Sequence, residues 1–162
     1  VKPTLLKEVV DSEGKVIKSL TPTIIKDITR DPVITVFDAN GFATSEKKVV
    51  QSWVVDLLKQ AMRKVVVDGT ASTIFEGMSI QTAGKTGTAE YCDNVAQANN
   101  RCTFGNWPAH AWYVGYAPYD DPEIAVVAFV YNGGEGSSVA APIVRQVMET
   151  YFELKAIDTA KK

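Results

Sequence analysis

The chain has 162 residues, which is enough for one domain with a hydrophobic core. Hydrophobic residues make up 46% and charged residues 22%, an ordinary balance for a globular domain, and a net charge of -2 gives a nucleic-acid partner no electrostatic support. No apolar run approaches the ~20 residues of a membrane-spanning helix, and no signal peptide is expected at the start.

The first part of the chain is rich in β-forming residues and turns. Residues 4–18 predict a hairpin whose turn is Asp11-Ser12-Glu13-Gly14. Pro22 and Pro32 argue against a long regular element in the segment that follows. Asp38-Ala39-Asn40-Gly41 predicts a second turn.

The clearest helical pattern comes next. Thr44 or Ser45 is suited to its N-cap, and Asp68-Gly69 is suited to its end. Apolar residues recur at spacings of three and four, which predicts a stripe packed against the core, with a partner-binding groove as the alternative. The stripe consists of Val49, Val50, Trp53, Val54, Leu57, Leu58, Ala61, Met62 and Val65.

Three strands and a closing helix are predicted in the second half, over residues 79–91, 109–116 and 123–131 and then from Ser137 or Ser138. The last two strands are almost continuously apolar, so both of their faces are expected to be covered. Gly133-Gly134-Glu135-Gly136 predicts a flexible bend before the helix. The buried stripe of that helix is predicted to be Ile143, Val144, Val147, Met148, Tyr151 and Phe152.

These elements predict an α+β fold, in which an antiparallel sheet is packed by helices. Residues 156–162 are expected to form a flexible tail.

Cys92 and Cys102 flank a polar segment, which favours a disulfide in an oxidising compartment. Two unpaired thiols are the alternative. A metal site is not expected, because these two cysteines and the single His110 give only three soft ligands. No cofactor is expected either, since the glycines near Gly133 lack the ending of a phosphate-binding loop.

Residues 83–90, Ala-Gly-Lys-Thr-Gly-Thr-Ala-Glu, carry the strongest chemical pattern. In an extended segment, Thr86 and Thr88 place both hydroxyls on one face, and Gly84 and Gly87 are expected to leave that face bare. Lys85 adds a positive charge, so the segment predicts a receptor for a carboxylate and an extended peptide. The alternative is an ordinary strand with surface threonines.

The Lys-Thr-Gly sequence lies in a longer series of motifs: His110-Ala-Trp-Tyr-Val-Gly-Tyr-Ala-Pro118, Ile124-Ala-Val-Val-Ala128, Asn132-Gly-Gly134 and Ala140-Ala-Pro-Ile143. The series resembles the C-terminal part of the transpeptidase domain of class B penicillin-binding proteins, the elongation-type peptidoglycan D,D-transpeptidases. The resemblance covers the chain from about Lys2 to about Leu154, and it implies that residues 1–155 are the C-terminal portion of a transpeptidase domain.

The resemblance implies a partial penicillin-binding/β-lactamase-like transpeptidase fold and a serine acyl-enzyme formed on D-Ala-D-Ala stem peptides. It implies that Lys85 is catalytic and that Thr86, Gly87 and Thr88 bind the substrate, with the two threonines holding its carboxylate. It also implies that the Thr88 N–H is one arm of the oxyanion hole. It further implies β-lactam binding, elongation-complex proteins as partners, and a membrane-anchored parent protein at the periplasmic or extracellular face of the cytoplasmic membrane.

The same family uses a Ser-x-x-Lys nucleophile motif and a Ser-x-Asn motif. Ser12 begins one Ser-x-x-Lys in a predicted turn and Ser45 begins another in the predicted helix, but no Ser-x-Asn occurs. The sequence therefore predicts part of a transpeptidase that is inactive alone. His110 is expected to pack rather than to act as a base. The alternatives are a non-catalytic peptide- or partner-binding module, and a β-lactam sensor or β-lactamase relative.

Overall fold

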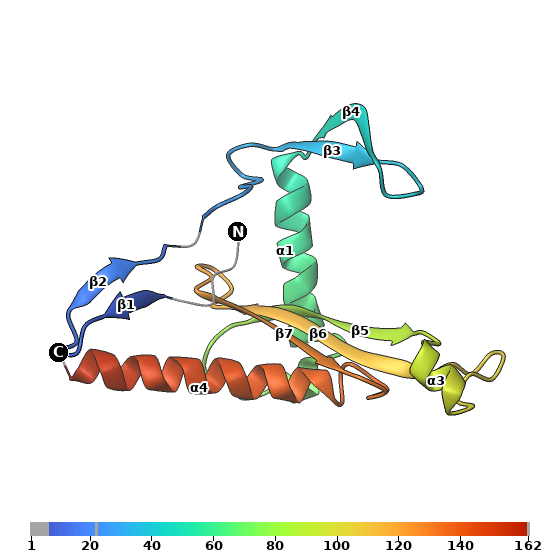
Figure 1. Ribbon diagram of the computed structural model, residues 1–162. Coiled ribbons are helices and arrows are strands. Elements are labelled where there is room, and N and C mark those ends of the chain that lie inside the picture. The colour runs from blue at the N-terminus through green and yellow to red at the C-terminus, as the bar shows by residue number, and fades with distance from the viewer. Residues whose placement is uncertain (1–6, 22, 162) are drawn as a thin grey trace. The chain divides into compact units, whose positions relative to one another are not determined.

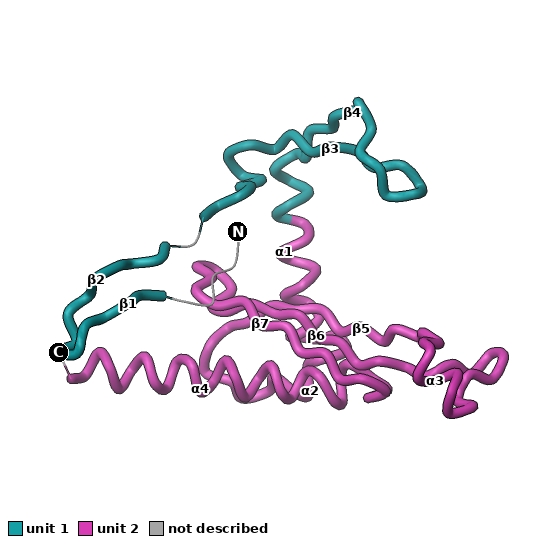
Figure 2. The backbone as a smooth tube through the Cα atoms, viewed as in Figure 1, with its two compact units in different colours: residues 1–56 teal, residues 57–162 magenta. Residues whose placement is uncertain are grey.

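The computed structural model describes residues 7–21 and 23–161, and the chain divides into two compact units (Figure 2). Unit 1 covers residues 1–56 and unit 2 covers residues 57–162. Helix α1 (Ser52–Val67) begins in unit 1 and ends in unit 2.

The first hairpin of unit 1 pairs β1 (Glu8–Val10) with β2 (Val16–Ser19) in antiparallel orientation. In its turn the Gly14 N–H donates to the Asp11 carbonyl at 3.1 Å, and Gly14 has a φ of 83°, a value that glycine adopts readily. The predicted hairpin is confirmed, although residues 4–6 lie outside the described part of the chain.

A second hairpin replaces the beginning of the predicted helix. The turn at residues 38–41 is confirmed, and it folds β4 (Ala43–Val49) back onto β3 (Val33–Phe37). The Thr44 hydroxyl donates to the Val36 carbonyl at 2.8 Å instead of capping a helix. The prediction that Thr44 or Ser45 opens the helix is therefore wrong, because strand pairing across the turn outweighs the local capping signal.

Helix α1 ends at Val67, directly before the predicted stop at Asp68-Gly69. The predicted stripe is mostly exposed: Trp53 is 62% exposed, and Leu57 and Leu58 are similar. Only the last turn reaches the core, where Val65 and Val66 pack into unit 2. The prediction of a core-facing stripe along the whole helix is wrong for the described residues.

Unit 2 contains an antiparallel sheet with strand order β5-β6-β7, formed by Ala83–Glu90, Ala109–Ala117 and Ile124–Val130. Helix α4 (Ala140–Ala160) runs along this sheet and contacts β6 and β7 (Figure 1). Two short helices, α2 (Ser72–Phe75) and α3 (Asn94–Ala98), complete the unit. This arrangement confirms the predicted α+β class.

The core lies between the sheet and α4. Small residues on both surfaces allow the helix to approach closely, and Tyr113 and Met148 fill the remaining space. The ring of Phe75 stacks on Tyr113 with the centroids 5.4 Å apart. The buried members include Ala111, Tyr113, Ala117, Ala128, Ala140, Ala141, Val144 and Met148.

The opposite face of the sheet carries Trp112, Val114, Val127 and Phe129, and all four are exposed. The expectation that both faces of these strands are covered is therefore wrong within the described part of the chain. The apolar residues of β6 and β7 do indicate strands, but the sequence of a strand does not specify which other elements cover its faces.

Helix α4 begins at Ala140 rather than at Ser137 or Ser138, and Val139 at its N-cap makes no side-chain capping bond. Of the predicted stripe, Val144 and Met148 are buried and Phe152 is partly buried, whereas the remaining members are exposed. The helix continues to Ala160, so residues 156–160 of the predicted tail are helical.

Gly84 tests how tightly β5 packs. A Cβ at this position would lie 2.2 Å from the Tyr113 hydroxyl, so Gly84→Ala must displace the ring and should lower the free energy of unfolding by about 1–3 kcal/mol. Denaturant titration monitored by circular dichroism measures the change.

Tyr113→Phe is the matched control. The Tyr113 hydroxyl is buried and has no hydrogen-bond partner among the described residues, and burial raises its pKa. Its removal should leave stability unchanged or slightly raised. Wild-type stability in Gly84→Ala would contradict this packing.

Candidate functional site

Strand β5 has one open edge. Among the described strands it pairs only with β6, with Thr86 opposite Tyr113 and Gly87 opposite Trp112. The Tyr91 N–H donates to the Pro108 carbonyl at 3.1 Å, so in this register the odd-numbered residues of β5 direct their N–H and C=O groups to β6. The Thr86 carbonyl therefore points to the open edge, where it accepts from the Lys85 ammonium at 2.6 Å. Because peptide groups alternate in direction along a strand, the Thr88 N–H points to the same open edge.

The threonines share one face, as the alternation predicts. Thr86 and Thr88 are on the face that Tyr113 occupies in β6, whereas Lys85 and Gly87 are on the other face. The cation and the two hydroxyls therefore do not project from the same side of the strand.

The expectation that Gly84 and Gly87 leave the threonine face bare is wrong. Gly84 does lie on that face, but the Tyr113 hydroxyl occupies the space beside it. Gly87 lies on the opposite face, where a Cβ would be 3.1 Å from the Trp112 Cβ. Access for a ligand is therefore provided by the strand edge rather than by a bare face.

Both hydroxyls have partners within unit 2. The Thr86 Oγ1 lies 2.9 Å from the Thr70 Oγ1, and the Thr88 hydroxyl donates to the Glu135 carboxylate at 3.0 Å. All of these side chains are at least partly exposed. A carboxylate is thus already bound at the position where the sequence predicts carboxylate recognition.

Sequence reasoning did not identify Thr70 or Glu135 as site residues. They are 16 and 47 residues from their partners in the chain, so no local pattern links them. The Gly-Glu-Gly sequence around Glu135 predicts a bend. Glycines also allow a segment to approach another backbone closely, and this second meaning was the available signal.

The polar loop after β5 is closed by a disulfide between Cys92 and Cys102, whose Cα atoms are 5.7 Å apart. Asp93 caps α3 by accepting from the Ala96 N–H at 2.7 Å, and it also accepts from the Tyr131 hydroxyl at 3.0 Å. The Ala96 hydrogen bond, with help from Tyr131, holds the pKa of Asp93 below its usual range. The loop is therefore tied to both β5 and the end of β7.

His110 is buried in β6, and its ring stacks on Tyr131 with the centroids 4.7 Å apart. Its Nδ1 accepts from the Asn132 N–H at 2.9 Å. This is the packing position expected from the sequence. No cluster of three or more metal-binding side chains occurs in the part of the chain that the structure describes.

Neither Ser-x-x-Lys sequence has the geometry of a nucleophile motif. Ser12 lies in the turn between β1 and β2, and Ser45 lies in β4. In a strand, residues three apart point to opposite faces, so Ser45 and Lys48 cannot adjoin as they would on one turn of a helix.

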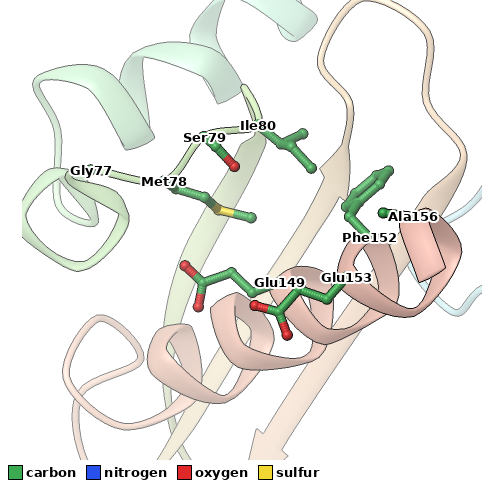
Figure 3. A pocket seen from close by; sticks show the side chains of 8 residues that line it. All are labelled: Gly77, Met78, Ser79, Ile80, Glu149, Phe152, Glu153 and Ala156. Atoms are coloured by element: carbon green, nitrogen blue, oxygen red, sulfur yellow. The ribbon is translucent and has the colours of Figure 1, made fainter. Parts of the chain in front are cut away.

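A separate hollow of about 360 Å³ lies between α4 and residues 77–80. Figure 3 shows the side chains that line it. Its walls include Met78 and Phe152, and the carboxylates of Glu149 and Glu153 lie on its helix side. No β5 residue lines it, so it does not belong to the candidate site.

Comparisons with known proteins agree on one family. The model of the penicillin binding protein transpeptidase domain matches residues 8–149. Peptidoglycan D,D-transpeptidase MrdA of Haemophilus influenzae is 36% identical over 108 residues, which cover 64% of this chain and 16% of that protein.

Two solved structures are similar in sequence and fold. Pseudomonas aeruginosa PBP2 in complex with WCK 5153 gives a TM-score of 0.52 at 31% identity, over 70% of this chain and 22% of that one. Helicobacter pylori PBP2 in complex with MreC gives 0.51 at 26% identity, over 68% of this chain and 20% of that one. The chain thus spans less than a quarter of the length of each of these proteins.

The disulfide next to β5 should stabilise unit 2. Cys92→Ser combined with Cys102→Ser removes a cross-link over a sequence separation of 10 residues, and the chain-entropy relation gives a loss of about 3 kcal/mol. Denaturant titrations of the oxidised, reduced and doubly substituted chains measure it. Reduced and substituted chains should match each other, and equal stability in all three would contradict a stabilising role.

Proposed function

The chain belongs to the penicillin-binding protein transpeptidase family, and we propose that it supplies the Lys-Thr-Gly strand of a serine-type peptidoglycan D,D-transpeptidase. One observation carries the proposal: the Thr88 hydroxyl binds a carboxylate beside an open strand edge. D,D-transpeptidase substrates are extended peptides that end in a carboxylate, so they present the two features that such an edge recognises.

Substrate binding follows from the geometry of β5. A stem peptide ending in D-Ala-D-Ala adds alongside the strand and forms backbone hydrogen bonds at its open edge. Thr86 and Thr88 hold the terminal carboxylate through their hydroxyls, whose spacing is fixed by the strand. Gly87, between them, pairs with Trp112 of β6, and a Cβ there would lie 3.1 Å from the Trp112 Cβ, so glycine keeps this part of the strand closely paired.

The catalytic step uses groups at the same edge. The Thr88 N–H donates to the oxygen of the scissile carbonyl and stabilises the negative charge that develops there, an effect of about 3 kcal/mol for one such donor. The Lys85 ammonium provides a positive field beside the reacting serine. The serine attacks the carbonyl, D-Ala leaves, and the amine of a second stem peptide then resolves the acyl-enzyme.

The serine lies outside these 162 residues in this proposal. Ser12 and Ser45 lack the required geometry and no Ser-x-Asn sequence is present, so the nucleophile and its partner motif come from another part of the transpeptidase. The chain alone then binds ligand without forming an acyl-enzyme. β-Lactams acylate the same serine in the whole protein, because they carry a reactive amide and a nearby carboxylate.

We further propose an elongation-type assembly as the setting. The Helicobacter pylori PBP2 that resembles this chain was solved with MreC, and a protein of that kind is the expected partner. The membrane-anchored whole protein would face the periplasm or the cell exterior, and the Cys92–Cys102 disulfide fits an oxidising compartment. In the described residues no helix has the length and apolar character to cross a membrane.

The proposal predicts that Thr88→Val slows acylation of the whole transpeptidase, which contains this chain together with the reacting serine. Loss of one hydrogen bond to a ligand carboxylate should lower the second-order rate of acylation by benzylpenicillin about tenfold or more, because such a bond contributes at least about 1.5 kcal/mol. Intact mass spectrometry over time measures the rate.

Thr73→Val is the matched control, since Thr73 is an exposed threonine of α2 that lies outside β5. It should be acylated at the wild-type rate. The 162-residue chain alone should gain no penicillin mass. A stoichiometric adduct on that chain, or equal rates for the two valine variants, would overturn the proposal.

A further inference from the structure

The loop that carries Glu135 is anchored on both sides. Before Glu135, the Asn132 N–H donates to the His110 Nδ1 at 2.9 Å and the Gly134 N–H donates to the Ala109 carbonyl at 3.0 Å. After it, the Val139 N–H donates to the Glu135 carbonyl at 3.1 Å. The segment expected to be a flexible bend is therefore held by several hydrogen bonds to β6 and to the start of α4.

Gly136 brings this loop directly against the Lys-Thr-Gly strand. A Cβ at Gly136 would lie 2.2 Å from the Trp112 carbonyl oxygen and 2.4 Å from the Gly87 carbonyl oxygen. These are backbone atoms of the β5–β6 pair, so only glycine fits at this position. The position of Glu135 beside Thr88 thus follows from backbone packing, and its hydrogen bond to Thr88 is a consequence.

Glu135 takes the only proton that the Thr88 hydroxyl can donate. A threonine hydroxyl has one donor, and here it is directed to the Glu135 Oε2 at 3.0 Å. A ligand carboxylate that binds Thr88 needs the same proton. Two carboxylates that approach the same hydroxyl would also repel each other, because like charges repel strongly at short distance.

We propose that Glu135 is a specificity-determining residue that competes with a ligand carboxylate for the Thr88 hydroxyl. The inference rests on the proposed function and adds a selectivity to it. Ligands with a free carboxylate must displace Glu135 before they gain the Thr88 hydrogen bond. Ligands without that charge incur no such repulsion, and their neutral oxygens accept the Thr88 proton more weakly than a carboxylate does.

The inference predicts that a Glu135 substitution affects only the charged one of two ligands that differ in one charge. In the transpeptidase that contains this chain and its serine, Glu135→Gln should raise the rate of acylation by benzylpenicillin about 3- to 10-fold. It should leave the rate with benzylpenicillin methyl ester unchanged. Glutamine keeps the length of the side chain and removes only its charge.

Two further variants complete the design. Glu135→Ala frees the Thr88 hydroxyl and should raise the benzylpenicillin rate by a similar factor. Glu153→Gln makes the same change of net charge in the hollow of Figure 3, which no β5 residue lines, and should react like the wild type with both ligands. Circular dichroism establishes that each variant is folded before its rate is measured.

The outcomes separate the inference from the proposed function. A rise for the acid alone, in both Glu135 variants, supports competition. Unchanged rates, a decrease, or an equal rise for acid and ester would overturn it while acylation of the wild type still supports the proposed function. A wild-type protein that neither ligand acylates would overturn both.

Discussion

The packing of α4 against the sheet is the interaction on which the rest of unit 2 depends. Alanines on both surfaces allow the close approach, and a Cβ at Gly115 would lie only 3.3 Å from the Met148 side chain and 2.9 Å from the Tyr113 ring. This contact determines which face of β6 is buried. Through the register, it also determines on which face of β5 the two threonines lie.

Because side chains alternate along a strand, β5 presents different side chains on its two faces, and its backbone presents further groups at the open edge. The hydroxyls of Thr86 and Thr88 lie on one face, the Lys85 side chain on the other, and the Thr88 N–H at the open edge. The same helix start that seals the core also brings Glu135 to Thr88 through the close contact of Gly136. Fold stability and ligand selectivity therefore depend on neighbouring backbone contacts.

The sequence predicted those elements that are specified by neighbouring residues in the chain. The two turns, the three strands of unit 2 and the end of α1 follow from glycine, aspartate and alternation, and the motif series predicted the family. Ser45 was misplaced because a capping pattern and a strand pattern overlap there, and pairing with β3 decided between them. Thr70 and Glu135 could not be found, since only the folded chain brings them to β5.

The most direct test of the carboxylate receptor uses the 162-residue chain and nuclear magnetic resonance. An N-acetylated D-Ala-D-Ala peptide is titrated into labelled chain, and backbone amide shifts are followed. The account predicts changes centred on the amides of Thr86 and Thr88, and none when the C-terminal carboxylate is replaced by an amide. Shifts confined to other residues, or equal shifts with the amidated peptide, would contradict it.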